Sequence, residues 1–428
     1  MAVVLALVVL AVLAALVALH WYAWRRLVRD TTRGPGRARR TGTAVLVAGP
    51  VLMVAALVAE RAGAPFWLQR VLGWPGFLWM ALTLYLLLAL VAGELVRPLV
   101  RRVVERGARA EQTAPVPAAV PVGPASADPE PADPEPAGSE PAGSEPAPPQ
   151  AQSAPSRRLF VSRLVGGTVA AAAVGTVGYG TYGVLRGPAV KRVTVPLAKL
   201  PRAAHGFRIA VVSDIHLGPV LGRGFAQKVV DTINSTRPDL IAVVGDLVDG
   251  SVKDLGPAAA PLSRLKARHG SYFVTGNHEY FSGADQWVEE VRRLGLHPLE
   301  NARTELPAFD LAGVNDLAGE SEGEGPDFAK ALGDRDTSRA VVLLAHQPLQ
   351  IHEAVRHHVD LQLSGHTHGG QLWPGDFVAA AANPTVAGLD RYGDTQLYVS
   401  RGAGAWGPPT RVGAPSDITV IELASRQA

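Results

Sequence analysis

The N-terminal run MAVVLALVVLAVLAALVALHWYAW is the feature that most constrains how this chain folds. It is long enough to cross a bilayer, and a backbone that enters hydrocarbon must satisfy its own hydrogen bonds as a helix. The run ends in the interface-seeking Trp21, Tyr22 and Trp24, followed by Arg25 and Arg26. A cleaved signal peptide would carry its positive charge before the apolar run, so we predict a retained membrane helix.

Two further apolar runs, at about residues 43–59 and 76–96, are flanked by arginines and predict a second and a third span; a buried core helix is the alternative for each. The composition agrees with membrane segments joined to a globular part, because hydrophobic residues make up 47% of the chain and charged residues only 18%. We therefore assign residues 1–106 to a membrane region with three transmembrane helices.

The arginines near these runs predict the orientation of the membrane region. The loop after the first run is rich in arginine, whereas the next loop holds only Arg61 and Arg70. Positive loops face the cytoplasm, so the first loop is expected there and the N-terminus outside. The sequence thus predicts a multi-pass protein of the cell membrane.

Residues 107–155 contain the tandem repeat ADPEPADPEPAGSEPAGSEP and have no apolar face to bury, so we predict a disordered linker. Residues 156–186 are either a fourth transmembrane helix or a twin-arginine signal anchor. The second interpretation rests on Ser156, Arg157, Arg158 and Phe160, although Ser162 stands where that signal usually has lysine. Both interpretations place the following domain outside the cytoplasm.

Residues 196–428 have the pattern of a soluble α/β domain in which five short apolar runs each end in polar side chains. These runs are RIAVVSDIH, DLIAVVGD, SYFVTGNHE, AVVLLAH and DLQLSGHTH. The residues at their ends are Asp214, His216, Asp246, Asn277, His278, His346, His366 and His368. Because ligands bind beyond the carboxyl ends of strands in such sheets, these side chains are expected to converge on one site.

The residue types at the strand ends predict a metal centre with hydrolytic chemistry. With no cysteine in the chain, a metal would be held by histidine, carboxylate and amide groups, which suit Mn, Fe, Zn or Co better than Ca or Mg. The two oxygens of Asp246 allow it to bridge two ions, and a two-metal site can clamp a phosphoryl group and activate water. We therefore expect two divalent metal ions as cofactors.

The motifs DIH, GDLVDG, GNHE, the later His346 and GHTHGG together resemble the full motif set of the calcineurin-like metallophosphoesterases over about residues 207–423. The likeness is to the bacterial membrane-associated branch, with its twin-arginine-exported phosphodiesterases and type 2 UDP-diacylglucosamine pyrophosphatase-like proteins. The resemblance implies an α/β fold, an αββα sandwich, here preceded by an all-α membrane region of about four transmembrane helices.

The resemblance also implies a role for each site residue. Asp214, His216 and His368 would bind one metal, Asn277, His346 and His366 would bind the other, and Asp246 would bridge them. His278 would be catalytic, by stabilising the charged transition state or protonating the leaving oxygen. Glu279 is expected to orient His278, Asp249 to be a nearby structural carboxylate, and Arg411 to match the arginine of the family's closing segment.

Together these features predict a membrane-anchored phosphoesterase that hydrolyses a phosphodiester or pyrophosphate, with a lipid or cell-envelope precursor as one candidate substrate. Two alternatives stay open: a nucleotide phosphodiesterase or nuclease with the same site, and a non-catalytic scaffold of the same fold. The small net charge of +3 and the lack of a basic, aromatic-interleaved stretch do not favour nucleic acid as a partner. The sequence specifies no oligomeric state.

Overall fold

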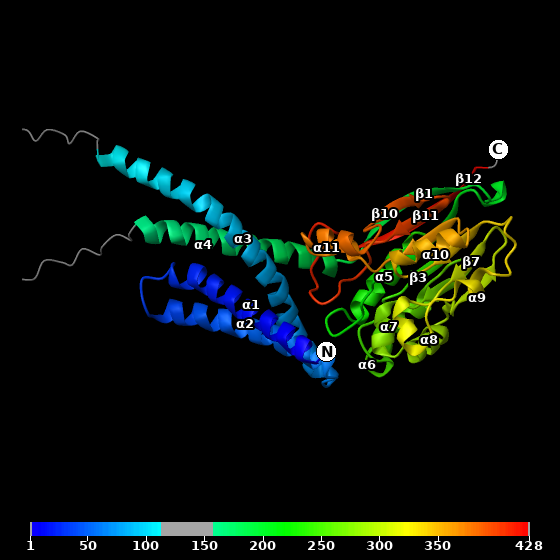
Figure 1. Ribbon diagram of the computed structural model, residues 1–428, viewed down its shortest axis with the longest axis horizontal. Helices are drawn as coiled ribbons and strands as arrows, with labels where there is room; N and C mark the ends of the chain where they lie inside the picture. Colours follow the sequence, from blue (N-terminus) through cyan, green and yellow to red (C-terminus); the bar gives the residue numbers. More distant parts are fainter. Residues whose placement is uncertain (1, 113–156, 427–428) are drawn as a thin grey trace, which may run out of the picture.

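The computed structural model describes residues 2–112 and 157–426 and begins with a bundle of long helices (Figure 1). The helices are α1 (Ala2–Trp24), α2 (Arg37–Arg61), α3 (Phe66–Gln112) and α4 (Arg157–Leu185). Within the described residues, these 4 helices are long and apolar enough to cross a membrane. The third continues past residue 106, and the rest of the predicted linker, like Ser156 of the twin-arginine pattern, lies outside the described residues.

Small residues allow these helices to pack closely. A Cβ atom on Gly76 of α3 would lie 2.6 Å from the Cβ of Ala56 on α2, so the two backbones meet with no room for a larger side chain. Ala81 and Leu90 of α3 and Ala173 of α4 are buried in one cluster between the helices. The fourth helix therefore packs along the third, although the linker separates them in sequence. Whether α4 is also a twin-arginine signal stays a prediction.

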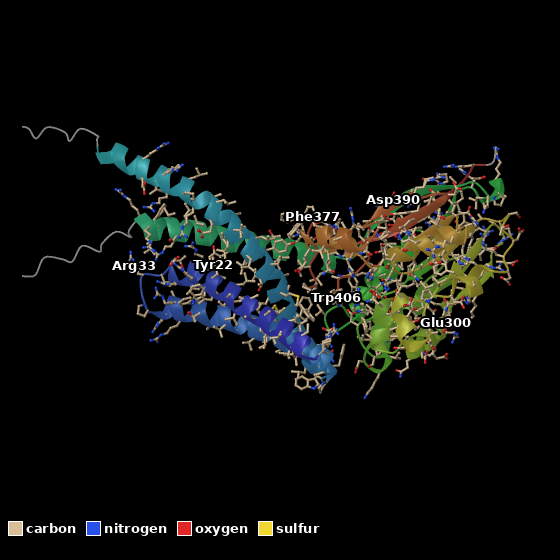
Figure 2. The ribbon with its side chains drawn as sticks, viewed as in Figure 1. Tyr22, Arg33, Glu300, Phe377, Asp390 and Trp406 are labelled. Carbon is tan, nitrogen blue, oxygen red and sulfur yellow. The ribbon has the colours of Figure 1, made fainter. Side chains whose placement is uncertain are left out.

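The C-terminal domain lies at the end of the bundle where α2 turns into α3 (Figure 1). The arginine-rich turn between α1 and α2 lies at the opposite end, as the positions of Arg33 and Trp406 show (Figure 2). The loop charges place the arginine-rich turn in the cytoplasm and the C-terminal domain outside it. These two parts of the chain are thus at opposite ends of the bundle. The orientation of the bundle in a membrane stays a prediction.

The C-terminal domain contains two six-stranded sheets. The first has the order β1 (Ala189–Leu197), β12 (Asp417–Ser425), β2 (Phe207–Val212), β3 (Leu240–Val244), β4 (Ser271–Val274) and β5 (His297–Pro298). The second has the order β10 (Gly388–Tyr392), β11 (Thr395–Val399), β9 (Leu361–Ser364), β8 (Val341–Leu344), β7 (Asp310–Gly313) and β6 (Ala302–Glu305). Strands β2, β3 and β4 are parallel neighbours in the first sheet, and β8 and β9 are parallel neighbours in the second.

Helices cover the outer face of each sheet. The first sheet packs against α5 (Arg223–Ser235), α6 (Val252–Ala259) and α8 (Ala284–Arg293), and the second against α9 (Phe328–Leu332) and α10 (Ile351–Arg356). Between the sheets lies a core that includes Ile209, Leu240, Leu344, Leu363 and Tyr398. The predicted αββα sandwich preceded by long apolar helices is confirmed.

The sheet begins earlier than the sequence boundary at Pro196. Strand β1 starts at Ala189 and pairs in parallel with β12 from its first residue, where Ala189 faces Asp417. Only the last part of β1 is buried, so its polar first half gives little hydrophobic signal in the sequence. Its pairing partner is the C-terminal strand, and so the first and last strands of the domain lie side by side.

Candidate metal centre

The structure brings all of the predicted site residues to one place between the two sheets. Asp214 and His216 follow β2, Asp246 follows β3, and Asn277 and His278 begin the short helix α7 (Asn277–Ser282) after β4. From the second sheet, His346 follows β8, while His366 and His368 follow β9. Parallel strands that are neighbours in a sheet end at the same edge, and the two packed sheets place these edges together.

Two groups of side chains meet at Asp246. In the first group, Nε2 of His368 lies 3.0 Å from Nε2 of His216 and 3.3 Å from Oδ1 of Asp214. The second group holds Asp246, His346 and His366, and Nε2 of His346 lies 3.2 Å from Oδ2 of Asp246.

The same oxygen of Asp246 lies 3.6 Å from Nε2 of His216, so it joins the two groups. Asn277 is near the second group, with its Oδ1 atom 3.0 Å from Nδ1 of His366.

The donor atoms fit divalent cations. Nε2 of His346 is buried without a hydrogen bond, although a carboxylate oxygen of Asp246 faces it. Its other nitrogen, Nδ1, lies 2.9 Å from the carbonyl oxygen of Val244, which orients the ring. Nδ1 of His216 is held in the same way by Asp249 at 2.8 Å. Histidines oriented through one nitrogen with the other aimed at carboxylates are typical of metal ligands.

The close packing of these groups shifts their pKa values in opposite directions. Burial lowers the pKa of His216, but the surrounding carboxylates, Asp249 first, outweigh it and raise this pKa to about 9. Burial also opposes ionisation of Asp249, yet His216 and His278 lower the pKa of this carboxyl to about 2. Burial and the neighbouring His346 lower the pKa of His366 to about 4. A bound cation would take the place of protons on such histidines, because metal ligands must be deprotonated.

The roles expected for Asp249 and Glu279 differ in the structure. Oδ1 of Asp249 lies 2.7 Å from Nδ1 of His278, so Asp249 is the carboxylate that orients His278. Glu279 instead accepts hydrogen bonds from the backbone N–H groups of Asp246 at 3.0 Å, Leu247 at 2.7 Å and Gly276 at 2.6 Å. Burial and the Asp246 carboxylate raise the pKa of Glu279 to about 7. The expectation for Glu279 was wrong because adjacency in sequence does not decide which side chains meet.

Replacing Glu279 with glutamine is expected to lower the free energy of unfolding by about 2 kcal/mol, because the amide NH₂ group cannot accept from the backbone donors. The change should appear as a lower Tm in thermal unfolding followed by tryptophan fluorescence. Glu289→Gln is the matched control, since the Glu289 side chain is 74% exposed and pairs with Arg292 on the surface. Equal Tm values for the two variants would contradict the assigned role of Glu279.

The backbone at the centre is held in an unusual conformation. Asp214, His216, Asp246, His366 and His368 all have positive φ angles, between 49° and 71°. Residues other than glycine rarely adopt this left-handed region, and where they do the surrounding structure must enforce it. The site is therefore shaped by the packed strand ends rather than by local preference.

Arg411 lies beneath the candidate metal centre and contacts His368. It is buried, and its Nη1 atom donates to the carbonyl oxygen of His368 at 2.9 Å, while Nη2 lies 3.0 Å from Nδ1 of the same histidine. Its backbone N–H donates to the carbonyl oxygen of Gly180 on α4 at 3.3 Å. Arg411 thus joins the predicted metal ligand His368 to the membrane region, a connection for which the sequence carries no signal.

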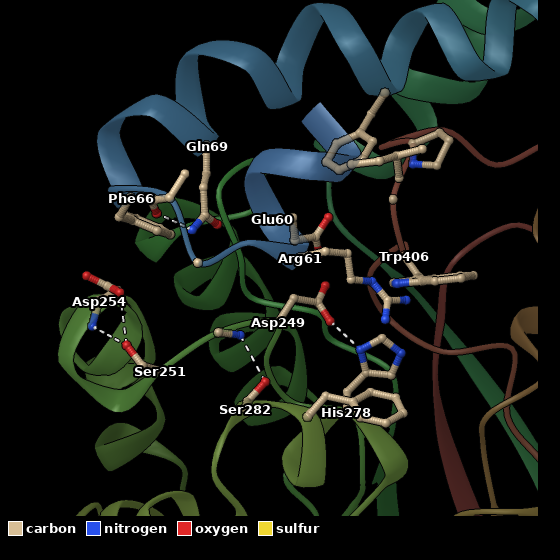
Figure 3. A pocket seen from close by; sticks show the side chains of 18 of the residues that line it. Glu60, Arg61, Phe66, Gln69, Asp249, Ser251, Asp254, His278, Ser282 and Trp406 are labelled. Atoms are coloured by element: carbon tan, nitrogen blue, oxygen red, sulfur yellow. Dashed lines mark hydrogen bonds and ion pairs between the residues drawn. The ribbon is translucent and has the colours of Figure 1, made fainter. Parts of the chain in front are cut away.

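The membrane region also reaches the centre from the other side. Glu60 and Arg61, at the end of α2, line a cavity of about 610 Å³ together with Asp249, His278 and Trp406 (Figure 3). Sequence reasoning missed these two residues, because they lie at the end of a membrane span far along the chain from every motif.

Comparison with known proteins indicates the family of the C-terminal domain. The family model of the calcineurin-like phosphoesterases matches residues 207–370, which include all of the predicted site residues. The chain is 39% identical over 259 residues to a zebrafish (Danio rerio) protein described as a transmembrane protein with metallophosphoesterase domain. That match covers 57% of this chain and 59% of the zebrafish protein, so it spans less than two thirds of this relative.

Two bacterial relatives are matched over more of their length. An uncharacterized metallophosphoesterase of Helicobacter pylori strain J99 is 36% identical over 63% of this chain and 73% of its own length. Another from Bacillus subtilis is 31% identical over 63% of this chain and 98% of its own length. Buried histidine and aspartate clusters of the kind found here suit metal binding in this family. The chain belongs to the calcineurin-like metallophosphoesterase family.

Proposed function

We propose that the protein is a membrane-anchored, dinuclear-metal phosphoesterase that hydrolyses a phosphodiester or pyrophosphate, with its catalytic domain outside the cytoplasm. The observation that carries the proposal is Asp246, whose carboxylate is shared by two groups of metal-ligand side chains. The topology rests on the loop charges and on the arginine-rich turn, which lies at the end of the bundle away from the catalytic domain (Figure 2).

In this proposal, Asp214, His216 and His368 would hold one ion, Asn277, His346 and His366 would hold the other, and Asp246 would contribute to both. Divalent ions such as Mn, Fe, Zn or Co held there would supply Lewis acidity for the phosphoryl oxygens and activate water for attack. The chain's own groups set the geometry: Asp249 fixes Nδ1 of His278 at 2.7 Å, which leaves Nε2 to face the substrate. From that position His278 stabilises charge on the phosphoryl group or protonates the leaving oxygen.

The alternatives have less support. A nuclease or nucleotide phosphodiesterase would use the same centre, but the chain shows no aromatic-interleaved basic stretch to favour nucleic acid. A non-catalytic scaffold is the other alternative, and the presence of every predicted ligand side chain at the centre argues against it.

The test is hydrolysis of bis-p-nitrophenyl phosphate by the full-length protein in lipid nanodiscs, first stripped with a chelator and then reloaded with Mn²⁺. We expect turnover that depends on the metal, and His278→Ala should lower kcat by about 10²-fold while the metal content is retained. His352→Ala, a change on α10 outside the centre, is the control. A folded protein that binds two ions but turns over neither this ester nor a pyrophosphate would favour the scaffold.

A further inference from the structure

The cavity beside the metal centre is formed by two parts of the chain. One side comes from the catalytic domain and includes His278 and Trp406, and the other comes from the facing ends of α2 and α3. Its volume of about 610 Å³ is that of a site for a small organic ligand. The membrane region is therefore a wall of the active site as well as an anchor.

Arg61 is the cationic group of this wall. Figure 3 shows its guanidinium directed toward the imidazole of His278 and the indole of Trp406. Within residues 2–112 and 157–426 the Arg61 guanidinium forms no hydrogen bond or ion pair. Its neighbour Glu60 lines both this cavity and a smaller recess beside His216 and Asp249. An unpaired guanidinium beside the catalytic histidine is suited to bind the oxygens of a phosphoester.

The rest of the wall is apolar. Leu57 of α2 and Phe77 and Met80 of α3 line the cavity, and Leu57 is 39% exposed. On the opposite side, Phe281 and Trp406 are 70% and 51% exposed and contact the ring of His278 edge-on. The cavity thus has a charged end at the metal centre and an apolar lining on helices that are candidate membrane spans.

We propose that the substrate is an amphiphilic phosphoester taken from the lipid surface, with its phosphate bound by Arg61 beside His278 and its chain packed against Leu57, Phe77 and Met80. This inference rests on the proposed phosphoesterase function and specifies its substrate class. A lipid is the expected occupant of the cavity because both α2 and α3 continue directly from the cavity wall into the apolar bundle. Arg61 is a substrate-positioning residue and the apolar wall determines specificity.

The experiment compares methyl and octyl p-nitrophenyl phosphate, which share the scissile bond and the leaving group and differ only in the alkyl chain. Full-length protein in nanodiscs, loaded with Mn²⁺, is expected to hydrolyse the octyl ester with a kcat/KM at least about tenfold higher. Leu57→Gln should reduce this preference severalfold. Val58→Gln, on the same helix outside this cavity, should keep it, and thereby controls for partitioning of the octyl ester into the nanodisc.

Arg61→Ala is expected to raise KM for the octyl ester about tenfold with little change in kcat, and Arg61→Lys should restore part of the loss. A purely structural role would lower kcat and protein stability instead of moving KM alone. Equal kcat/KM for both esters, or the same loss of preference in the Leu57 and Val58 variants, would overturn the lipid inference while leaving the phosphoesterase intact. No turnover of either ester or of a pyrophosphate with any metal would refute the proposed function and this inference with it.

Discussion

Replacing Asp246 with asparagine is expected to lower kcat/KM for bis-p-nitrophenyl phosphate on the order of 10³-fold or more, about 4 kcal/mol of transition-state stabilisation. Asp246 is 2% exposed and supplies the oxygen that joins the two groups of ligand side chains. His346 and His216 draw the pKa of its carboxyl well below the ordinary value against the effect of burial, so it carries a full negative charge. Asparagine keeps the shape, including an oxygen for the N–H of His278 at 3.0 Å, but removes the charge.

The rate should be measured together with metal content by mass spectrometry, and the expected result is loss of at least one of two bound ions. Asp285→Asn is the control, because Asp285 is an exposed residue in the first turn of α8. An Asp246→Asn protein that retains two ions and more than a tenth of the wild-type rate would show that Asp246 does not bridge.

Replacing Gly365 with alanine is expected to destabilise the domain by about 3 kcal/mol and to disturb the first group of ligands. A Cβ atom at this position would lie 1.7 Å from Oγ of Ser213 and 2.4 Å from Oδ2 of Asp214. Neither neighbour can move away freely, because both are fully buried and Ser213 also donates to the carbonyl oxygen of Val244 at 2.9 Å. The added methyl group must therefore displace the strand end that carries Asp214.

The measurement is Tm by tryptophan fluorescence, with metal content determined on the same samples. Gly224→Ala in α5 is the control: no atom lies within 4 Å of its added Cβ, and alanine favours a helix, so its Tm should stay the same or rise. If the two glycine variants had equal Tm values, the close approach at Gly365 would not limit stability.

Most of the fold could be predicted from short-range patterns. The buried strands β3 and β8 are unbroken apolar runs, and a strand buried on both faces leaves such a run in the sequence. The start of the domain could not be placed in this way. Strand β1 at Ala189–Leu197 is half exposed and is held by pairing with β12 at the other end of the domain, a contact that no local pattern encodes.

The candidate site divides in the same way. Each side chain that meets at Asp246 comes at the end of an apolar strand run and is of a type that binds metals, and so these residues could be predicted from the sequence. The residues that contact these side chains could not be predicted in this way. Asp249 rather than Glu279 contacts His278, and Arg411 lies beneath His368, because these contacts depend on how loops from different strands pack against one another.

The sequence by itself determined the apolar helices, the strand runs of the α/β domain and the candidate metal ligands that end them, because hydrophobic periodicity and strand-end residues are local properties of the chain. The αββα sandwich was implied by the resemblance of the motifs to the calcineurin-like metallophosphoesterases. Only the tertiary structure decided that the end of α2 lines the cavity beside the candidate metal centre. The approach of Arg61 to His278 depends on how the helical bundle docks on the C-terminal domain, through contacts such as the hydrogen bond of 3.0 Å from the Tyr85 hydroxyl to the carbonyl oxygen of Trp373. Such docking joins residues hundreds of positions apart. It depends on the shapes of two folded surfaces, and no single segment of the sequence encodes them.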